Sequence, residues 1–155
     1  MQEENIERIL NLHADRLYRL CLVMLGNPQD AEDAVQETLL KYLQKSPVFR
    51  DTEHEKAWLL TVAANTCRDQ LRFRARHPKV DFDSISLATE EKDNAILDAL
   101  MTLPEKFRLV LVLHYVEGYS VKEIAAVIHK TVSAVKMRLQ KGRRLLEECY
   151  RKEYL

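Results

Sequence analysis

The chain has 155 residues, 46% of them hydrophobic, and its 24 lysines and arginines balance 24 aspartates and glutamates. This length allows one domain or two small ones, and only 3 glycines and 4 prolines favour helices over a turn-rich sheet. No apolar run is long enough to cross a bilayer and the N-terminus is acidic, which argues against a membrane-inserted or secreted protein. We expect a soluble, cytoplasmic chain.

The neutral total hides a strong segmentation of charge. Residues 1–57 hold 7 basic and 11 acidic side chains, and residues 58–80 hold 5 and 1. Residues 81–105 hold 1 and 7, and residues 106–155 hold 11 and 5. Two acidic segments therefore alternate with two basic ones, which indicates contact with DNA at two places and with another partner elsewhere.

The first predicted helix covers Ile6–Leu25, with Gly26 as its C-cap. Its apolar residues recur at helical spacing: Ile6, Ile9, Leu10, Leu17, Leu20, Cys21 and Met24. Asn27 and Pro28 then suit the N-cap and first position of a second helix, which runs to about Gln44.

The second helix has a polar side that its apolar residues leave uncovered. This side carries Asp33, Gln36, Glu37 and Leu40. Carboxylates near a helix N-terminus are favoured by the helix dipole, so a solvated face and a partner-binding face are both open from the helix rules alone.

Residues 46–55 (SPVFRDTEHE) predict a loop, because Pro47 cannot continue the second helix. Phe49 and Arg50 form an aromatic–cation pair in this loop. Such a pair can stack on an exposed base, or the ring can simply fill the core beneath it.

A third predicted helix runs from about Glu55 to about Arg76. Trp58, Leu59 and Val62 begin its inward face. Its outward face and basic end are formed by Asn65, Arg68, Asp69, Arg72, Arg74 and Arg76. The helix dipole also favours arginines at a C-terminus, so this charge has a purely structural explanation as well.

His77 and Pro78 end the third helix, and the acidic, serine-rich residues that follow show no periodicity. We therefore predict domains at 1–76 and 93–155, joined by a flexible linker at 77–92. The second domain begins with a helix over about 89–102, whose apolar stripe is Ile96, Leu97, Leu100 and Met101. Another helix follows Pro104 and ends before the turn at Glu117 and Gly118, with His114 as a core or boundary histidine.

Two capping signals between Ser120 and Leu146 divide one apolar periodicity into two helices, which is a helix-turn-helix pattern. Ser120 with Glu123 forms a capping box, and Thr131 is the next N-cap. The second helix has a buried stripe of Val132, Val135, Leu139, Gly142 and Leu146. Its opposite face carries Ser133, Lys136, Met137, Gln140, Lys141 and Arg144. A basic helix of this diameter fits the major groove, although a solvated amphipathic helix is the common alternative for such a pattern by itself.

Cys21, Cys67 and Cys149 are odd in number, far apart and without a CxxC pair. We expect three buried, reduced thiols, no metal site and no cofactor.

Two stretches of the chain resemble sigma-70 factors. TLPEKFRLVLVLHYVEGYSVKEIAAVIHKTVSAVKMRL is similar to their −35-reading domain, and GNPQDAEDAVQETLLKYL with AWLLTVAANTCRDQLR is similar to their core-binding and −10-reading domain. Their order and the single linker are those of the extracytoplasmic-function (group 4) subclass. The resemblance covers roughly residues 17–147 and implies an all-α, two-domain sigma factor that is not an enzyme.

The resemblance also implies roles for particular residues. Asp33, Gln36, Glu37 and Leu40 would dock on the clamp coiled coil of core RNA polymerase. Phe49, Arg50 and Asn65 would capture a flipped base of the −10 strand, with Arg68, Arg72, Arg74 and Arg76 holding the backbone. Capturing the base would offset the cost of unpairing, so melting would need no ATP. The family often has an anti-sigma partner that covers these same faces.

In the second domain the resemblance implies a −35 interface. Ser133, Lys136, Met137 and Gln140 would face bases, while Lys122, Lys130, Lys141 and Arg144 would mainly hold phosphates. Thr131, the N-cap of this helix, belongs to the same −35 set. His129 stands where the family usually has glycine, and Met137 where a small polar residue is frequent.

Two other functions compete with this one. A stand-alone helix-turn-helix regulator would use residues 1–76 to dimerise and would bind a two-fold operator without polymerase. A nuclease would use Asp30, Glu32, Asp33 and Glu37 as a metal cluster, but these carboxylates are spread around a helix with no supporting histidine or lysine.

Overall fold

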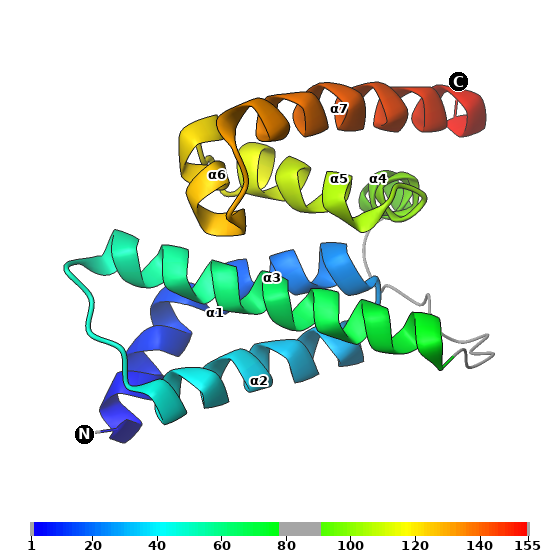
Figure 1. The fold of residues 1–155 in the computed structure, drawn as a ribbon. Coiled ribbons are helices and arrows are strands. Elements are labelled where there is room, and N and C mark those ends of the chain that lie inside the picture. Colours follow the sequence, from blue (N-terminus) through cyan, green and yellow to red (C-terminus); the bar gives the residue numbers. More distant parts are fainter. Residues whose placement is uncertain (1, 78–90, 155) are drawn as a thin grey trace. The chain divides into compact units, whose positions relative to one another are not determined.

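The computed structural model describes residues 2–77 and 91–154, and every regular element in these ranges is a helix (Figure 1). The chain divides into two compact units, residues 1–81 and 82–155. The all-α class predicted from the sequence is confirmed. No helix in the described ranges is long and apolar enough to cross a membrane.

The first unit consists of α1 (Gln2–Leu25), α2 (Pro28–Lys45) and α3 (Thr52–Arg76), and each helix packs against the other two. Its core is aliphatic. The fully buried side chains include Ile9, Leu17, Leu20, Met24, Ala31, Ala34, Leu59, Leu60 and Ala63. These residues recur on one face of each helix, so the amphipathic periodicity of the sequence produces the bundle directly.

Local caps set the ends of these helices. Gly26 adopts a left-handed φ of 73° after α1, and Asn27 Oδ1 accepts a hydrogen bond from the Asp30 amide at 3.1 Å at the start of α2. Both caps were predicted. The start of α3 was predicted about three residues too late, because Asp51 is its N-cap and accepts from the His54 amide at 2.8 Å.

The second unit consists of α4 (Glu91–Met101), α5 (Glu105–Leu111), a π-helical turn η1 (Val112–Val116), α6 (Val121–Ile128) and α7 (Val132–Tyr154). The π-helical turn was not foreseen from the sequence. Residues 78–90 of the predicted linker lie outside the described residues, and the last two linker positions already belong to α4.

The helix-turn-helix forms with the caps that the sequence predicts. Ser120 Oγ accepts from the Glu123 amide at 3.1 Å, and the Glu123 carboxylate accepts from the Ser120 amide at 2.9 Å. His129 ends α6 in the left-handed region, with φ 57°. Thr131 Oγ1 then accepts from the Ala134 amide at 3.1 Å and starts α7.

Replacing His129 with glycine is expected to stabilise the second unit by about 0.5–1 kcal/mol. The left-handed conformation costs a residue with a Cβ about 1–2 kcal/mol, and the greater flexibility of unfolded glycine offsets part of the gain. Hydrogen exchange of the α6 and α7 amides should slow accordingly. Lys130→Gly is the control: Lys130 lacks a positive φ, so glycine there should only destabilise, and equal effects of both variants would contradict this explanation.

Two burial predictions were wrong. Val132, placed on the buried stripe of α7, is 40% exposed, and Leu10 and Ile96, named on apolar stripes, are 41% and 44% exposed. Cys149 is only half-buried, and Thr102 Oγ1 donates to its Sγ at 3.2 Å.

The other two thiols, Cys21 and Cys67, are fully buried as expected. A hydrogen bond with Cys21 and burial raise the pKa of Cys67, so this thiol stays protonated.

Candidate functional site

The exposed face of α7 carries a row of basic and polar side chains. Lys136, Met137, Gln140, Lys141 and Arg144 are exposed along it, together with Ser133 near the start of the helix. Met137 is 69% exposed, which is unusual for a large apolar side chain. The face thus presents hydrogen-bonding groups, cations and one apolar contact in a single row.

The opposite face of α7 holds the helix in place. Val135 and Leu139 are buried, and Gly142 lies so close to α5 that an added Cβ would be 3.4 Å from Leu111 Cδ1 and from Phe107 Cβ. The Nζ of Lys141 lies 5.7 Å from the Phe107 ring centroid, which brings its charge over an aromatic face. The packing therefore fixes which side of α7 faces outward.

The remaining predicted residues of this surface lie around the turn. Lys122 and Lys130 are exposed near the ends of α6. The Thr131 hydroxyl is already an acceptor in the N-cap, so its contribution to the surface is positional. Sequence reasoning missed Arg143, whose Nη1 donates to the hydroxyl of the exposed Tyr115 at 2.7 Å and so ties α7 to η1.

In the first unit the loop before α3 is held by an aromatic cluster. The Phe49 ring centroid lies 6.2 Å from Tyr42, 5.8 Å from Trp58 and 5.3 Å from His54. Of the two roles left open for Phe49, packing beneath the loop is the one that these contacts describe. Arg50 is exposed beside it, and its backbone amide donates to His54 Nδ1 at 3.2 Å.

The outer face of α3 carries Asn65, Arg72 and Arg76, which are exposed, with Arg68 half-buried between them. Arg72 makes only a weak surface pair with Asp69, at 3.4 Å. Arg74 differs: its guanidinium pairs with Asp30 and donates to the Leu25 carbonyl at 3.1 Å. That arginine already joins α3 to the start of α2.

A buried ionic network, which the sequence did not predict, joins α1 to α3. Arg8 donates to both carboxylate oxygens of Glu55, at 2.9 and 2.7 Å. Arg16 donates to His13 Nδ1 at 3.2 Å, so the Nε2 of a neutral imidazole carries the proton that faces Glu55 Oε1 at 3.0 Å. The Glu55 side chain is 4% exposed and that of His13 only 1%.

This network shifts both titrations downward. The hydrogen bonds from Arg8 lower the pKa of Glu55, with His13 adding to the effect against the cost of burial. Burial lowers the pKa of His13 by more than its hydrogen bond with Glu55 raises it, and the charges of Arg16 and Arg8 lower it further.

Acidification is therefore expected to destabilise the first unit in two steps. Because the pKa of folded His13 lies below its ordinary 6.5, the unfolded chain binds protons more readily as the pH falls through that value, and stability is lost. The depressed pKa of Glu55 adds a further loss below its ordinary 4.5. Urea unfolding followed by the fluorescence of Trp58, the chain's single tryptophan, measures both steps. His13→Gln, whose amide can donate to Glu55 and accept from Arg16, should remove the first; a slope that persists in this variant would contradict the assignment.

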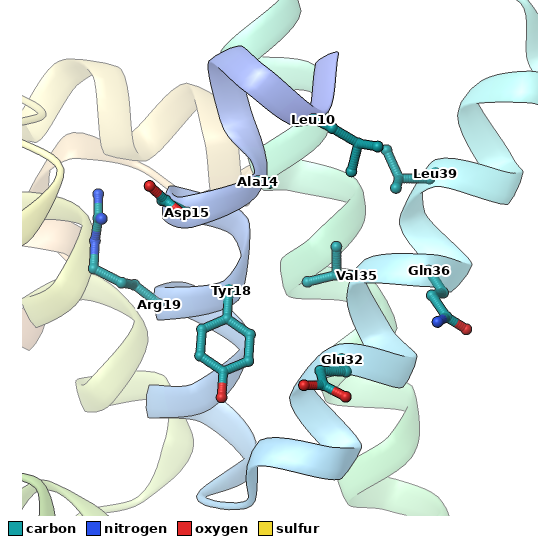
Figure 2. Close-up of a pocket in the computed structure, with 9 residues that line it drawn as sticks. All are labelled: Leu10, Ala14, Asp15, Tyr18, Arg19, Glu32, Val35, Gln36 and Leu39. Atoms are coloured by element: carbon teal, nitrogen blue, oxygen red, sulfur yellow. The ribbon is translucent and has the colours of Figure 1, made fainter. Parts of the chain in front are cut away.

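The acidic side of α2 borders a groove. Asp33, Gln36 and Glu37 are exposed, and Leu40 is 55% exposed. Between α1 and α2 lies a hollow of about 490 Å³, lined by Leu10, Ala14, Asp15, Tyr18, Arg19, Glu32, Val35, Gln36 and Leu39. Figure 2 shows Leu10 and Leu39 pointing toward each other across it, with Glu32 and Gln36 projecting from α2. The groove thus has an apolar floor and polar edges, and Gln36 belongs to both the groove and the predicted docking face.

No group of three or more potential metal ligands comes together among the residues that the structure describes. Of the four carboxylates in the nuclease alternative, Asp30 is paired with Arg74.

Comparison with known proteins matches both units to domain families. A model described as sigma-70 region 2 matches residues 9–77, and one described as sigma-70 region 4 matches residues 93–146. The extracytoplasmic-function RNA polymerase sigma factor SigL of Mycobacterium tuberculosis is 36% identical over 146 residues, which cover 86% of this chain and 82% of SigL. SigW of Bacillus subtilis, from the same group, is 29% identical over 92% of this chain and 87% of its own length.

Among solved structures, the chain is similar to the sigma factor RpoE from Bartonella quintana, crystallised in complex with the anti-sigma factor NepR. The TM-score is 0.83 and the identity 25%, over 97% of this chain and 99% of RpoE.

Proposed function

The chain belongs to the extracytoplasmic-function sigma factors of the sigma-70 family, and from that premise we propose how its residues direct transcription initiation. Sigma factors bind core RNA polymerase and confer promoter specificity. The observation that carries the assignment is the exposed basic face of α7, held outward by the buried Val135, Leu139 and Gly142. We assign the first domain to residues 1–76, the linker to 77–92 and the second domain to 93–155.

In the second domain, α7 reads the −35 element in the major groove. Ser133, Lys136, Met137 and Gln140 lie along the first turns of the helix, where base edges are within reach. Lys122, Lys130, Lys141 and Arg144 hold phosphates, and Thr131 fixes the start of the helix.

In the first domain, the loop before α3 and the outer face of that helix capture the −10 strand. The aromatic cluster around Phe49 keeps the loop in one shape beside the exposed Arg50. Asn65 lies on α3, with Arg68, Arg72 and Arg76 along the same side of this helix. Arg74 holds α3 in place through its ion pair with Asp30. Holding an unstacked base offsets the few kcal/mol of unpairing, which allows melting without ATP.

Core polymerase docks on the exposed side of α2. Asp33, Gln36 and Glu37 offer polar contacts, Leu40 offers an exposed apolar one, and the α1–α2 groove beside them accepts a side chain of the partner. A central apolar contact within a polar rim is the usual anatomy of a binding hot spot.

The remaining assignments follow from this role. The protein needs no catalytic residues, metal or cofactor of its own, because the polymerase carries the chemistry. It acts in the cytoplasm, where polymerase and chromosome lie. An anti-sigma factor, like the one bound to the related RpoE, would inhibit it by covering the same faces.

Transcription in vitro tests the proposed function. Purified protein, sigma-free core polymerase and fragmented genomic DNA of the host are combined, and the RNA 5′ ends are sequenced. Discrete starts that share two upstream elements are expected. A Leu40→Lys variant should lose both these starts and co-elution with core polymerase, whereas Leu12→Lys, at a similarly exposed leucine on α1, should retain them. No starts and no co-elution, together with tight binding to a two-fold operator, would favour the stand-alone regulator.

A further inference from the structure

The C-terminal end of α3 carries an exposed aromatic stack that no part of the proposed function uses. Phe73 is 55% exposed, and its ring centroid lies 4.2 Å from that of His77, with 20° between the two planes. Both residues are outside the core of the first unit. A large apolar ring left in water at this position is a candidate contact surface.

The stack is held in shape by the end of the helix. The His77 backbone amide donates to the Phe73 carbonyl at 2.9 Å, and His77 Nδ1 lies 3.1 Å from the same oxygen. With its proton on Nδ1, the imidazole donates this second bond, which keeps the ring over Phe73 and leaves Nε2 pointing elsewhere. The backbone at the end of α3 therefore holds the two rings as one ordered surface.

The charges around the stack indicate an anionic partner. Arg72 and Arg76 are exposed on the same helix end, next to Phe73 and His77 in the sequence. Residues 58–80 carry 5 basic side chains and 1 acidic one, so this is a strongly cationic part of the first unit. Exposed aromatic rings among cations are the combination that binds single-stranded nucleic acid, where the rings stack on bases and the cations hold phosphates.

The position along α3 relates the stack to the proposed −10 contacts. Phe73 follows Asn65 by eight residues, which is about 12 Å along a helix that rises about 1.5 Å per residue. Arg76 follows Asn65 by eleven residues and returns to nearly the same side of the helix, since eleven residues make just over three full turns. A strand held at Asn65 and running along the arginines would thus pass beside the stack within about four nucleotides at the roughly 3.4 Å spacing of stacked DNA, and within fewer where its bases are unstacked and its backbone is extended.

We propose that Phe73 and His77 form a second base-stacking site, which binds an unstacked base of the promoter's single strand a few nucleotides from the base held near Asn65. Arg72 and Arg76 hold the adjoining phosphates. This site rests on the proposed −10 role of the first unit and adds a contact that depends on Phe73. Single-stranded DNA is the partner because a base offers its face to a ring only after it leaves the duplex, and the aromatic face accepts every base.

The test uses the full-length chain in complex with core polymerase. Its probes are −10 non-template oligonucleotides with 2-aminopurine at successive positions, because the fluorescence of this base falls when it stacks. At one position near the −10 element, the wild type should quench the 2-aminopurine fluorescence, and Phe73→Ala should leave that fluorescence unquenched. The affinity of Phe73→Ala for the oligonucleotide should be about tenfold lower, which is within the range of base–aromatic stacking. Phe73→Tyr should restore both signals, since tyrosine offers the same ring.

Leu12→Ala, which removes an equally exposed apolar side chain from α1, is the matched control and should bind like the wild type. Trp58 fluorescence checks that Phe73→Ala leaves the first unit folded. If Phe73→Ala quenches and binds as the wild type does, the stacking site is overturned. If Phe73→Ala loses the same affinity for fully duplex DNA, Phe73 contacts a groove. If Phe73→Ala binds core polymerase more weakly in the absence of DNA, Phe73 contacts protein. Either result also overturns the stacking site. Failure of the wild type itself to bind the oligonucleotides with core polymerase would instead count against the proposed function.

Discussion

Glu55→Gln is expected to lower the free energy of unfolding of the first unit by about 2–3 kcal/mol. The carboxylate is almost completely buried and takes two hydrogen bonds from Arg8 and one from His13. A glutamine amide can accept only some of them and turns its NH₂ group toward other donors. Removing one partner of a fully buried pair costs about 3–5 kcal/mol; because the Arg8 side chain is 45% exposed, water compensates part of the loss.

Urea unfolding monitored by Trp58 fluorescence measures this change, because that residue lies in the first unit. Glu53→Gln is the matched control: Glu53 is an exposed carboxylate in the first turn of the same helix, and its loss should cost less than about 1 kcal/mol. If the two variants are equally stable, the network contributes nothing beyond surface charge. The Glu55 variant should also lose transcription from every promoter alike, since the fold and not a promoter contact is affected.

Gln140→Ala is expected to relax base preference at one position of the −35 element by about 1–3 kcal/mol, roughly 5- to 150-fold in relative affinity. The side chain is exposed on the outward face of α7, about two and a half turns from the Thr131 cap. A glutamine amide can make paired hydrogen bonds with one base edge, and alanine can make none. Transcription by the holoenzyme from promoters with every single base substitution in the −35 element provides the measurement.

Two further variants separate base reading from general affinity. Lys136→Ala should weaken binding to the −35 element, because it removes a cation near the start of α7. Arg144→Ala, which removes a proposed phosphate contact, should weaken all −35 sequences alike and lower the salt dependence of binding by about one charge. An unchanged base profile for Gln140→Ala would remove this residue from the base-reading set.

Most helix boundaries of this protein are readable from the sequence because caps act over three or four residues. Asn27, Ser120 with Glu123, and Thr131 each bind an amide three positions along the chain, so neighbouring letters contain the whole interaction. The left-handed His129 was indicated by the resemblance instead, because His129 stands where the family usually has glycine. The true start of α3 has the same local basis, because its N-cap Asp51 also binds an amide three positions along the chain, that of His54.

The candidate site was predictable where it lies on one face of one helix. Helical spacing places Lys136, Gln140 and Arg144 together, and the structure exposes all three. Phe73 and His77 are also four residues apart, which places them on one side of a helix, but the sequence does not distinguish an exposed ring from a ring in the core. Arg74 was not predictable in the same way. The sequence does not distinguish it from the other arginines of α3, and only the folded structure shows that it forms an ion pair with Asp30.

The sequence by itself determines the all-α class and the helix-turn-helix, since both depend on periodicity and on interactions between near neighbours. The segmented charge and the resemblance to sigma factors are also present in the sequence, as residue counts and as two motif stretches. Packing alone reveals the Arg8–Glu55–His13 network, the aromatic support under the loop at Phe49 and the α1–α2 groove. These features join residues far apart in the sequence, such as Arg8 and Glu55, 47 positions apart. Burial then converts ordinary surface residue types into a buried ionic network, and burial is a property of the folded unit that no local pattern contains.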